Sequence, residues 1–167
     1  MPQFAYIVMG SNIEPRQGYL DQAAQALQAR FPDGFGRSNN FSSTPYQGLE
    51  QSDYLNGACR FQTDLSPQKL LVVLLAIEAE LGRVRSGVHW GNRTVDLDIA
   101  LFGDVVVQEK GLVIPHYDME NRDFFLVPLL ELDPGLINPR SGEPLVKHLG
   151  KIPVTSRTGL HILGADA

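Results

Sequence analysis

The first apolar run of the chain covers residues 4–9, and it stops at the turn-forming residues 10–12. A short, partly β-branched apolar run with such a boundary predicts a buried strand that leaves into a loop. From residue 19 onward the apolar side chains recur with helical spacing, at Leu20, Ala23, Ala24 and Leu27. The chain is therefore predicted to begin with a strand, a loop and a helix.

A second helix carries clear boundary signals. The segment before it is predicted to hold a weaker strand, a polar loop and a stronger strand, at residues 35–42, 44–53 and 56–62. Ser66 then provides an N-cap, Pro67 suits the first helical position, and Gly82 stands where a helix ends. The pattern predicts a helix over residues 67–81. Its body is apolar on nearly every side, so we expect it to be buried between layers.

Residues 94–101 alternate between apolar and acidic positions. On a strand, alternate side chains share a face, so Asp96 and Asp98 are expected on one face. The opposite face is expected to carry Val95, Leu97, Ile99 and Leu101. Residues 105–108 are predicted to pair with this strand as a hairpin across residues 103–104.

The order of the elements indicates the fold class. Residues 124–132 fit a last helix, and the tail after Pro134 predicts only short elements. The order strand, helix, strand, strand, helix, strand is that of a ferredoxin-like α+β sandwich with a mostly antiparallel sheet, in which helices cover one face. Because no repeat or change of composition marks a boundary, residues 1–167 are expected to form a single domain.

The composition and net charge limit the classes of molecule that the protein is expected to bind. The chain is 43% hydrophobic and 20% charged, with 14 basic and 19 acidic residues and a net charge of −5. That balance is typical of a globular protein and offers no overall attraction for nucleic acid or an anionic membrane. Any phosphate site must therefore be local. The N-terminal segment resembles neither a signal peptide nor a membrane span, so we expect a cytoplasmic protein.

Cys59 is the only cysteine, so no intramolecular disulfide can form. It lies inside an apolar stretch, which favours a buried structural thiol over a reactive one.

The strongest chemical signal is the acidic pair. Two carboxylates about 7 Å apart on one strand face can hold hard cations such as Mg²⁺, although a bare Asp-x-Asp is more often a solvated surface. Arg83, Arg85 and Arg93 flank the pair in an otherwise acidic chain. Carboxylates, a metal and arginines are the components of phosphoryl transfer, whereas the alternative is a set of weak surface ion pairs. We therefore predict a magnesium-dependent enzyme that acts on a polyphosphate.

Residues 114–124 contain a second polar cluster, with His116, Tyr117 and Arg122 as candidate contacts to an anion. A histidine that follows a proline is more often a hydrogen-bonding loop residue. The chain has no zinc-ligand spacing, and residues 10–16 lack the spacing of a Walker A loop.

Recognition of a flat ring is suggested by Tyr54, Asn56, Trp90 and Phe124, because aromatic rings can sandwich a heterocycle and an amide can read its edge. Each residue alone is more often part of the core or of a turn.

Several of these segments together resemble the 6-hydroxymethyl-7,8-dihydropterin pyrophosphokinase family. The matching segments follow the family's order over most of the chain: residues 5–12, 43–45, 53–56, 82–85, 90–99, 115–124 and 127–131. The resemblance implies transfer of pyrophosphate from ATP to the pterin hydroxymethyl group, with AMP as the second product, in folate biosynthesis. It also implies a three-layer αβα sandwich that acts as a monomer.

The resemblance assigns roles by position. It implies two Mg²⁺ ions on Asp96 and Asp98, and catalytic roles for these two residues and for Arg83, Arg85 and Arg93. ATP would be contacted by Arg83, Arg85, Trp90, Arg93, Ile99, His116, Tyr117 and Arg122. The pterin pocket would comprise Thr44, Pro45, Tyr54, Asn56, Trp90 and Phe124.

The chain departs from the family pattern at two positions. His89 stands where many members carry arginine or lysine, and Asn92 replaces a common proline. We expect a less rigid, less cationic loop and a slower or more pH-sensitive closing step, to be tested with His89→Arg. The loop after Thr44 is one residue short, which leaves the pocket shape open there.

Two other functions compete with this interpretation. A polymerase-β-like nucleotidyltransferase also combines Gly-Ser with paired aspartates, but there the two motifs lie close together, whereas Ser11 and Asp96 are far apart. A weakly active paralogue that binds a pterin or nucleotide is disfavoured by the intact aspartates and arginines, and His89 leaves it open.

Overall fold

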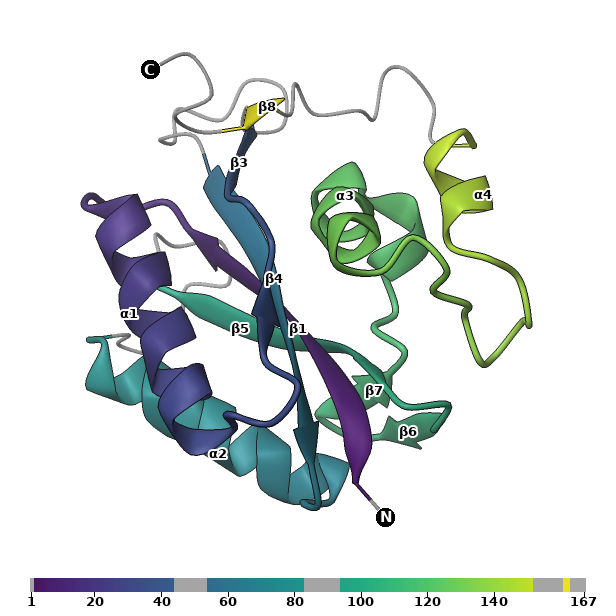
Figure 1. Ribbon diagram of the computed structural model, residues 1–167, viewed down its shortest axis with the longest axis horizontal. Coiled ribbons are helices and arrows are strands. Elements are labelled where there is room, and N and C mark those ends of the chain that lie inside the picture. Colours follow the sequence, from purple (N-terminus) through teal and green to yellow (C-terminus); the bar gives the residue numbers. More distant parts are fainter. Residues whose placement is uncertain (1, 44–53, 83–93, 152–160, 163–167) are drawn as a thin grey trace.

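The protein is a layered α+β sandwich in this computed structural model, which describes residues 2–43, 54–82, 94–151 and 161–162. Figure 1 shows α1 (Arg16–Arg30) and α2 (Pro67–Glu80) on one face of a central sheet, and α3 (Asp123–Leu132) on the other. A short helix, α4 (Val146–Leu149), lies beside α3. The three-layer αβα arrangement is confirmed, and the narrower expectation that helices cover only one face is wrong for α3.

The main sheet of the described part of the chain has six strands. They are β1 (Gln3–Ser11), β2 (Gly36–Arg37), β3 (Phe41–Ser43), β4 (Tyr54–Thr63), β5 (Asp96–Phe102) and β8 (His161–Ile162). The order is β5-β1-β4-β3-β8, β2 also pairs with β4, and every pairing is antiparallel. The predicted strand over residues 35–42 is therefore two short strands, β2 and β3, separated by polar residues.

The helix boundaries follow their caps. In α2, Ser66 Oγ accepts a 3.2 Å hydrogen bond from the backbone N–H of Lys69, and Pro67 occupies the first turn, as predicted. The first helix begins at Arg16, directly after Pro15 and three residues before the predicted start. Its buried face is the predicted one, because Leu20, Ala23, Ala24 and Leu27 are all buried.

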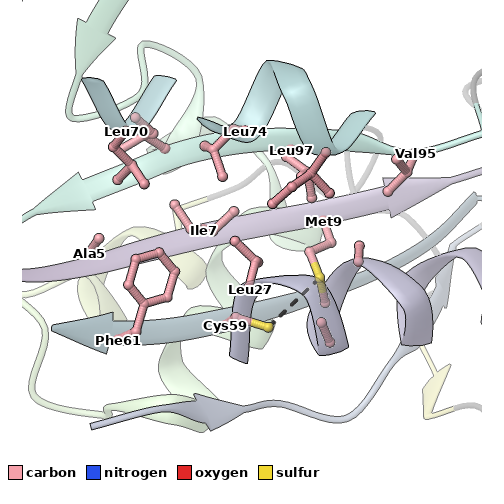
Figure 2. Packing of buried hydrophobic residues seen from close by; sticks show 14 of the residues in the cluster. Ala5, Ile7, Met9, Leu27, Cys59, Phe61, Leu70, Leu74, Val95 and Leu97 are labelled. Atoms are coloured by element: carbon pink, nitrogen blue, oxygen red, sulfur yellow. Dashed lines mark hydrogen bonds between the residues drawn. The ribbon is translucent and has the colours of Figure 1, made fainter. Parts of the chain in front are cut away.

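β1 is buried on both faces and separates two cores. Ala5, Ile7 and Met9 point toward α1 and α2, whereas Tyr6 and Val8 point toward α3. Figure 2 shows the first core, in which the β1 side chains meet Leu27 of α1 and Leu74 of α2.

Cys59 lies in that first core and is fully buried, which confirms the structural thiol. Its Sγ lies 3.8 Å from Met9 Sδ (Figure 2). Burial raises the pKa of the Cys59 thiol to about 12, so the group stays neutral at physiological pH.

A β-bulge divides β5 into two parts. Leu97 and Ile99 pair with Met9 and Ile7, but the register shifts by one residue before Leu101 pairs with Tyr6. Leu101 therefore belongs to the core under α3, and its predicted place on the face of Leu97 and Ile99 is wrong. The extra residue of the bulge reverses the alternation, which a strict period of two cannot represent.

The predicted hairpin between β5 and residues 105–108 is also wrong. Residues Val107–Glu109 form β6, which pairs with β7 (Leu112–Ile114) in a separate two-stranded sheet. The outer edge of β5 makes other contacts: Leu97 N–H donates to Glu78 Oε2, and Ala100 O accepts from His116 N–H at 3.0 Å. These groups occupy edge positions that a hairpin partner would need.

No helix among the residues that the structure describes is long and apolar enough to cross a membrane.

Candidate active site

Asp96 and Asp98 lie on the face of β5 that looks toward α3. Asp96 pairs with Gly10 and Asp98 pairs with Val8, whose side chain belongs to the core under α3. Both aspartates are half-buried. Their common direction is as predicted, and strand geometry places their Cα atoms about 7 Å apart.

The acidic pair fits a cation that keeps open coordination positions. Within the described ranges, no group of three or more His, Cys, Asp or Glu side chains is placed to hold a metal ion. Magnesium is commonly bound through one or two carboxylates, with water and substrate phosphates as the other ligands. Two half-buried carboxylates match that requirement.

The candidate pterin residues of β4 share this face. Asn56 pairs with Gly10 from the side opposite Asp96, and Tyr54 lies two residues before Asn56 on the same face. Asn56 is buried, with 5% of its surface exposed, and Tyr54 is half-buried. A candidate ring-binding amide and a candidate metal ligand are therefore separated only by a residue without a side chain.

His116 is held next to β5 by its backbone hydrogen bond to Ala100 O. Its ring stacks on Phe125 at 4.6 Å, and Nδ1 accepts a 3.2 Å hydrogen bond from the backbone N–H of Asp118. Burial lowers the pKa of His116, and the nearby carboxylates of Asp118 and Asp96 oppose this effect. The neutral ring, with Nδ1 as acceptor, carries its proton on Nε2 and can donate it to an anion.

Arg122 and Phe124 flank the start of α3. Arg122 Nε donates a 2.8 Å hydrogen bond to Asp118 Oδ2, which orients the guanidinium beside His116's loop. Phe124 is partly buried and lies 5.3 Å from the Phe125 ring. The cluster predicted over residues 114–124 is thus linked to the acidic strand through His116, and Arg122 is bonded to the same loop.

Two other candidate ATP contacts, Tyr117 and Ile99, do not project their side chains into the site from the buried face of the sheet. Tyr117 is 74% exposed, and its ring stacks on His116 at 4.6 Å. Ile99 is 5% exposed, and its side chain lies in the core under α1 and α2. The Ile99 side chain therefore faces away from the aspartates. A ligand on their side of the sheet can contact only the backbone of Ile99.

The remaining candidates lie outside the described residues. They are Thr44, Pro45, Arg83, Arg85, Trp90 and Arg93, together with His89 and Asn92 of the predicted closing loop.

Two residues at the site were not assigned a role from the sequence. Glu78 is 3% exposed, and its Oε2 accepts a 2.8 Å hydrogen bond from the backbone N–H of Leu97, between the aspartates. Its spacing from Leu70, Leu74 and Ile77 already placed it on the buried helix face. No pattern in the sequence marked Gly10 as part of the site, because its position matters only through its strand partners Asn56 and Asp96.

An antiparallel sandwich with paired carboxylates, an imidazole and aromatic rings around one face has the groups that a transferase of phosphate-bearing groups requires. A family model described as 7,8-dihydro-6-hydroxymethylpterin-pyrophosphokinase (HPPK) matches residues 6–134. The chain therefore belongs to this family and is a pyrophosphokinase of folate biosynthesis. Family membership excludes the polymerase-β-like alternative.

Curated relatives agree with this assignment. The chain is 43% identical over 138 residues to 2-amino-4-hydroxy-6-hydroxymethyldihydropteridine pyrophosphokinase of Haemophilus influenzae, covering 82% of this chain and 86% of the relative. It is 36% identical over 152 residues to the protein of the same name from Synechocystis, covering 91% and 77%.

Solved structures confirm the fold. A crystal structure of Plasmodium falciparum HPPK-DHPS superposes with a TM-score of 0.70 at 14% identity, over 90% of this chain. The chain spans 43% of that longer protein. At this identity the likeness concerns the fold alone.

Proposed function

We propose that the face of the sheet under α3 binds ATP and 6-hydroxymethyl-7,8-dihydropterin next to each other, and that pyrophosphate passes between them there. The observation that carries this proposal is the cross-strand row Asn56, Gly10, Asp96. Neighbouring strands lie about 4.8 Å apart, so the outer two residues of the row are about 10 Å apart at Cα. That spacing suits a ring held at one end of the row and a metal-bound phosphate at the other.

The family generally uses Mg²⁺. We propose that Asp96 and Asp98 hold two such ions. When bound, Mg²⁺ neutralises charge on the polyphosphate and on the leaving nucleotide. The protein's own contribution is to hold two carboxylates on a strand whose other face is anchored in the core by Leu97 and Ile99.

The ATP side of the site is proposed to combine cationic and neutral donors. His116 Nε2–H and the guanidinium of Arg122 donate to phosphate or ribose oxygens, since His116 is hydrogen-bonded to β5 and Arg122 is bonded to Asp118 of the same loop. Further proposed contacts are Arg83, Arg93, Trp90 and Tyr117, the backbone of Ile99, and Arg85 as the residue that closes over both substrates. Arginine donors can stabilise the negative charge that develops on the bridging oxygens in the transition state.

The acceptor side is proposed to read the pterin ring by its faces and its edge. Tyr54, Phe124 and Trp90 offer aromatic surfaces, Thr44 and Pro45 complete the pocket, and the Asn56 amide both donates and accepts at the ring edge. The substrate hydroxyl then attacks the β-phosphorus of ATP and AMP leaves. A largely dissociative transition state needs little help from a general base, so positioning carries most of the catalysis.

The test is incubation with ATP, Mg²⁺ and 6-hydroxymethyl-7,8-dihydropterin, with AMP and ADP separated by chromatography. AMP that appears only with the pterin supports the proposal. Asn56→Ala is expected to raise KM for the pterin about tenfold, the equivalent of about 1.4 kcal/mol, with little change in KM for ATP. Production of ADP, or binding of the pterin without turnover, would identify a different activity or a ligand-binding module.

We propose further that residues 1–167 act as one domain and as a monomer in the cytoplasm. Both cores share the same sheet, which supports a single domain. Light scattering at assay concentration tests the oligomeric state, and a dimer mass would contradict the monomer.

A further inference from the structure

Gly10 occupies the centre of the row that joins the two halves of the site. It lies near the end of β1 and pairs with Asn56 on β4 and with Asp96 on β5. Because it follows Tyr6 and Val8 at intervals of two, its missing side chain would point toward α3. The position is buried.

Lack of space for a side chain, and not the backbone conformation, explains why residue 10 is a glycine. The φ angle of Gly10 lies outside the left-handed region, so alanine could adopt the same backbone. A Cβ atom added to Gly10 would lie 3.0 Å from Asn56 Oδ1 and 3.9 Å from Tyr54 Cδ1. The Asn56 amide therefore lies directly against the place above β1 where a Cβ at Gly10 would sit, and it would have to shift by a few tenths of an ångström to admit one.

This arrangement has a consequence for recognition. An amide that reads a ring edge uses one donor and one acceptor in fixed directions, and a shift of a few tenths of an ångström weakens both contacts. The pterin hydroxymethyl oxygen must also meet the phosphate over Asp96 at near-attack distance. Displacing Asn56 would disturb the ring first and the reacting oxygen as a result.

We propose that Gly10 is a positioning residue for the acceptor substrate: the bare backbone at Gly10 lets the Asn56 amide lie across β1 toward Asp96. This inference rests on the proposed role of Asn56. Gly10 itself contacts neither reacting group and acts through Asn56.

The experiment is a double-mutant cycle with Gly10→Ala and Asn56→Ala. Gly10→Ala is expected to raise KM for the pterin about five- to tenfold and to change KM for ATP less than twofold. In the Asn56→Ala background the same change should have almost no further effect, because the side chain that it displaces is gone. Independent, multiplying effects, or no effect of Gly10→Ala, would overturn the proposal.

Gly36→Ala is the matched control. A Cβ at this glycine of β2 would lie 3.1 Å from Arg60 Nε, a similar contact at another place in the sheet. It should leave KM for the pterin within twofold of wild type. An equal rise in KM would show that general loss of sheet order explains the Gly10 variant, which sinks the proposal.

Two further outcomes separate the inference from the proposed function. If Asn56→Ala leaves KM for the pterin unchanged, the proposed role of Asn56 is wrong, whatever Gly10 does. If Gly10→Ala alone does not fold, the double variant should fold, because it relieves the contact, and should match Asn56→Ala in KM. A double variant that also fails to fold would place the conflict elsewhere and overturn the inference.

Discussion

Glu78 Oε2 accepts a 2.8 Å hydrogen bond from the backbone N–H of Leu97, which ties the end of α2 to the residue between the two aspartates. Glu78 is 3% exposed, and the N–H group belongs to the edge strand β5. A buried N–H on a strand edge needs an acceptor, because leaving it without one costs about 1–3 kcal/mol. The Glu78 carboxylate therefore satisfies an edge N–H group of β5 and fixes the position of the strand that carries Asp96 and Asp98.

Glu78→Leu is expected to lower the free energy of unfolding by about 1–3 kcal/mol, because it removes this acceptor. Glu78→Gln should lose less, since its carbonyl oxygen can still accept. Urea denaturation measures both. Glu80→Gln is the control, because Glu80 makes an exposed ion pair with Arg30 that contributes about 0–1 kcal/mol. Equal stability of the Leu and Gln variants would show that the hydrogen bond is not what matters.

Asp96→Asn and Asp98→Asn should each reduce turnover by about 10²–10³-fold, because each replaces a carboxylate at the centre of charge stabilisation. The fold should survive, since both side chains are half-buried and their removal relieves repulsion between like charges. AMP release and thermal melting measure the two effects. Asp104→Asn, at an exposed turn after the same strand, should keep full turnover. Near-normal activity in either site variant would rule out its role.

The His116 ring should titrate below its ordinary pKa of 6.5 in the metal-free protein, because burial disfavours the charged form. The unfolded chain then takes up the proton first, so this histidine's contribution to stability is present above pH 6.5 and is lost as pH falls through the folded pKa. NMR of the ring protons, assigned with His116→Asn, gives the midpoint. Denaturation between pH 7.5 and 5 should be less pH-dependent in that variant. A midpoint at or above 6.5 would contradict the prediction.

Cys59 should resist thiol reagents in the native protein and react only on unfolding. The side chain is fully buried, and its pKa is raised to about 12, so thiolate is scarce at neutral pH. Cys59→Ser should cost about 1–3 kcal/mol of stability, because it buries a hydroxyl in an apolar core, whereas Cys59→Ala leaves only a small cavity. Labelling of the native protein at the rate of a free thiol would contradict the burial.

Much of the fold was predictable because its signals are local. The short apolar run of β1, bounded by turn-forming residues, indicated a buried strand, and the cap at Ser66 located the start of α2. The common direction of Asp96 and Asp98 followed from the period of two along a strand. Each of these features depends on residues within a few positions of one another, so the chain encodes them directly.

The errors have a common physical origin. The bulge that turns Leu101 toward α3 arises from the pairing of β5 with β1, and an alternating pattern cannot reveal an inserted residue. The missing hairpin follows from what already contacts the outer edge of β5, namely Glu78 and His116. In both cases a partner distant in sequence decided the local geometry.

The sequence by itself determined the chemistry of this protein: the acidic pair, the cationic and aromatic residues that accompany it, and the family to which they belong. Only the tertiary structure decided that Asn56 and Asp96 meet across Gly10 and that Glu78 anchors Leu97. The physical reason is register. Which residues face each other across strands depends on how distant segments pair, and a shift of one residue would turn each side chain to the opposite face.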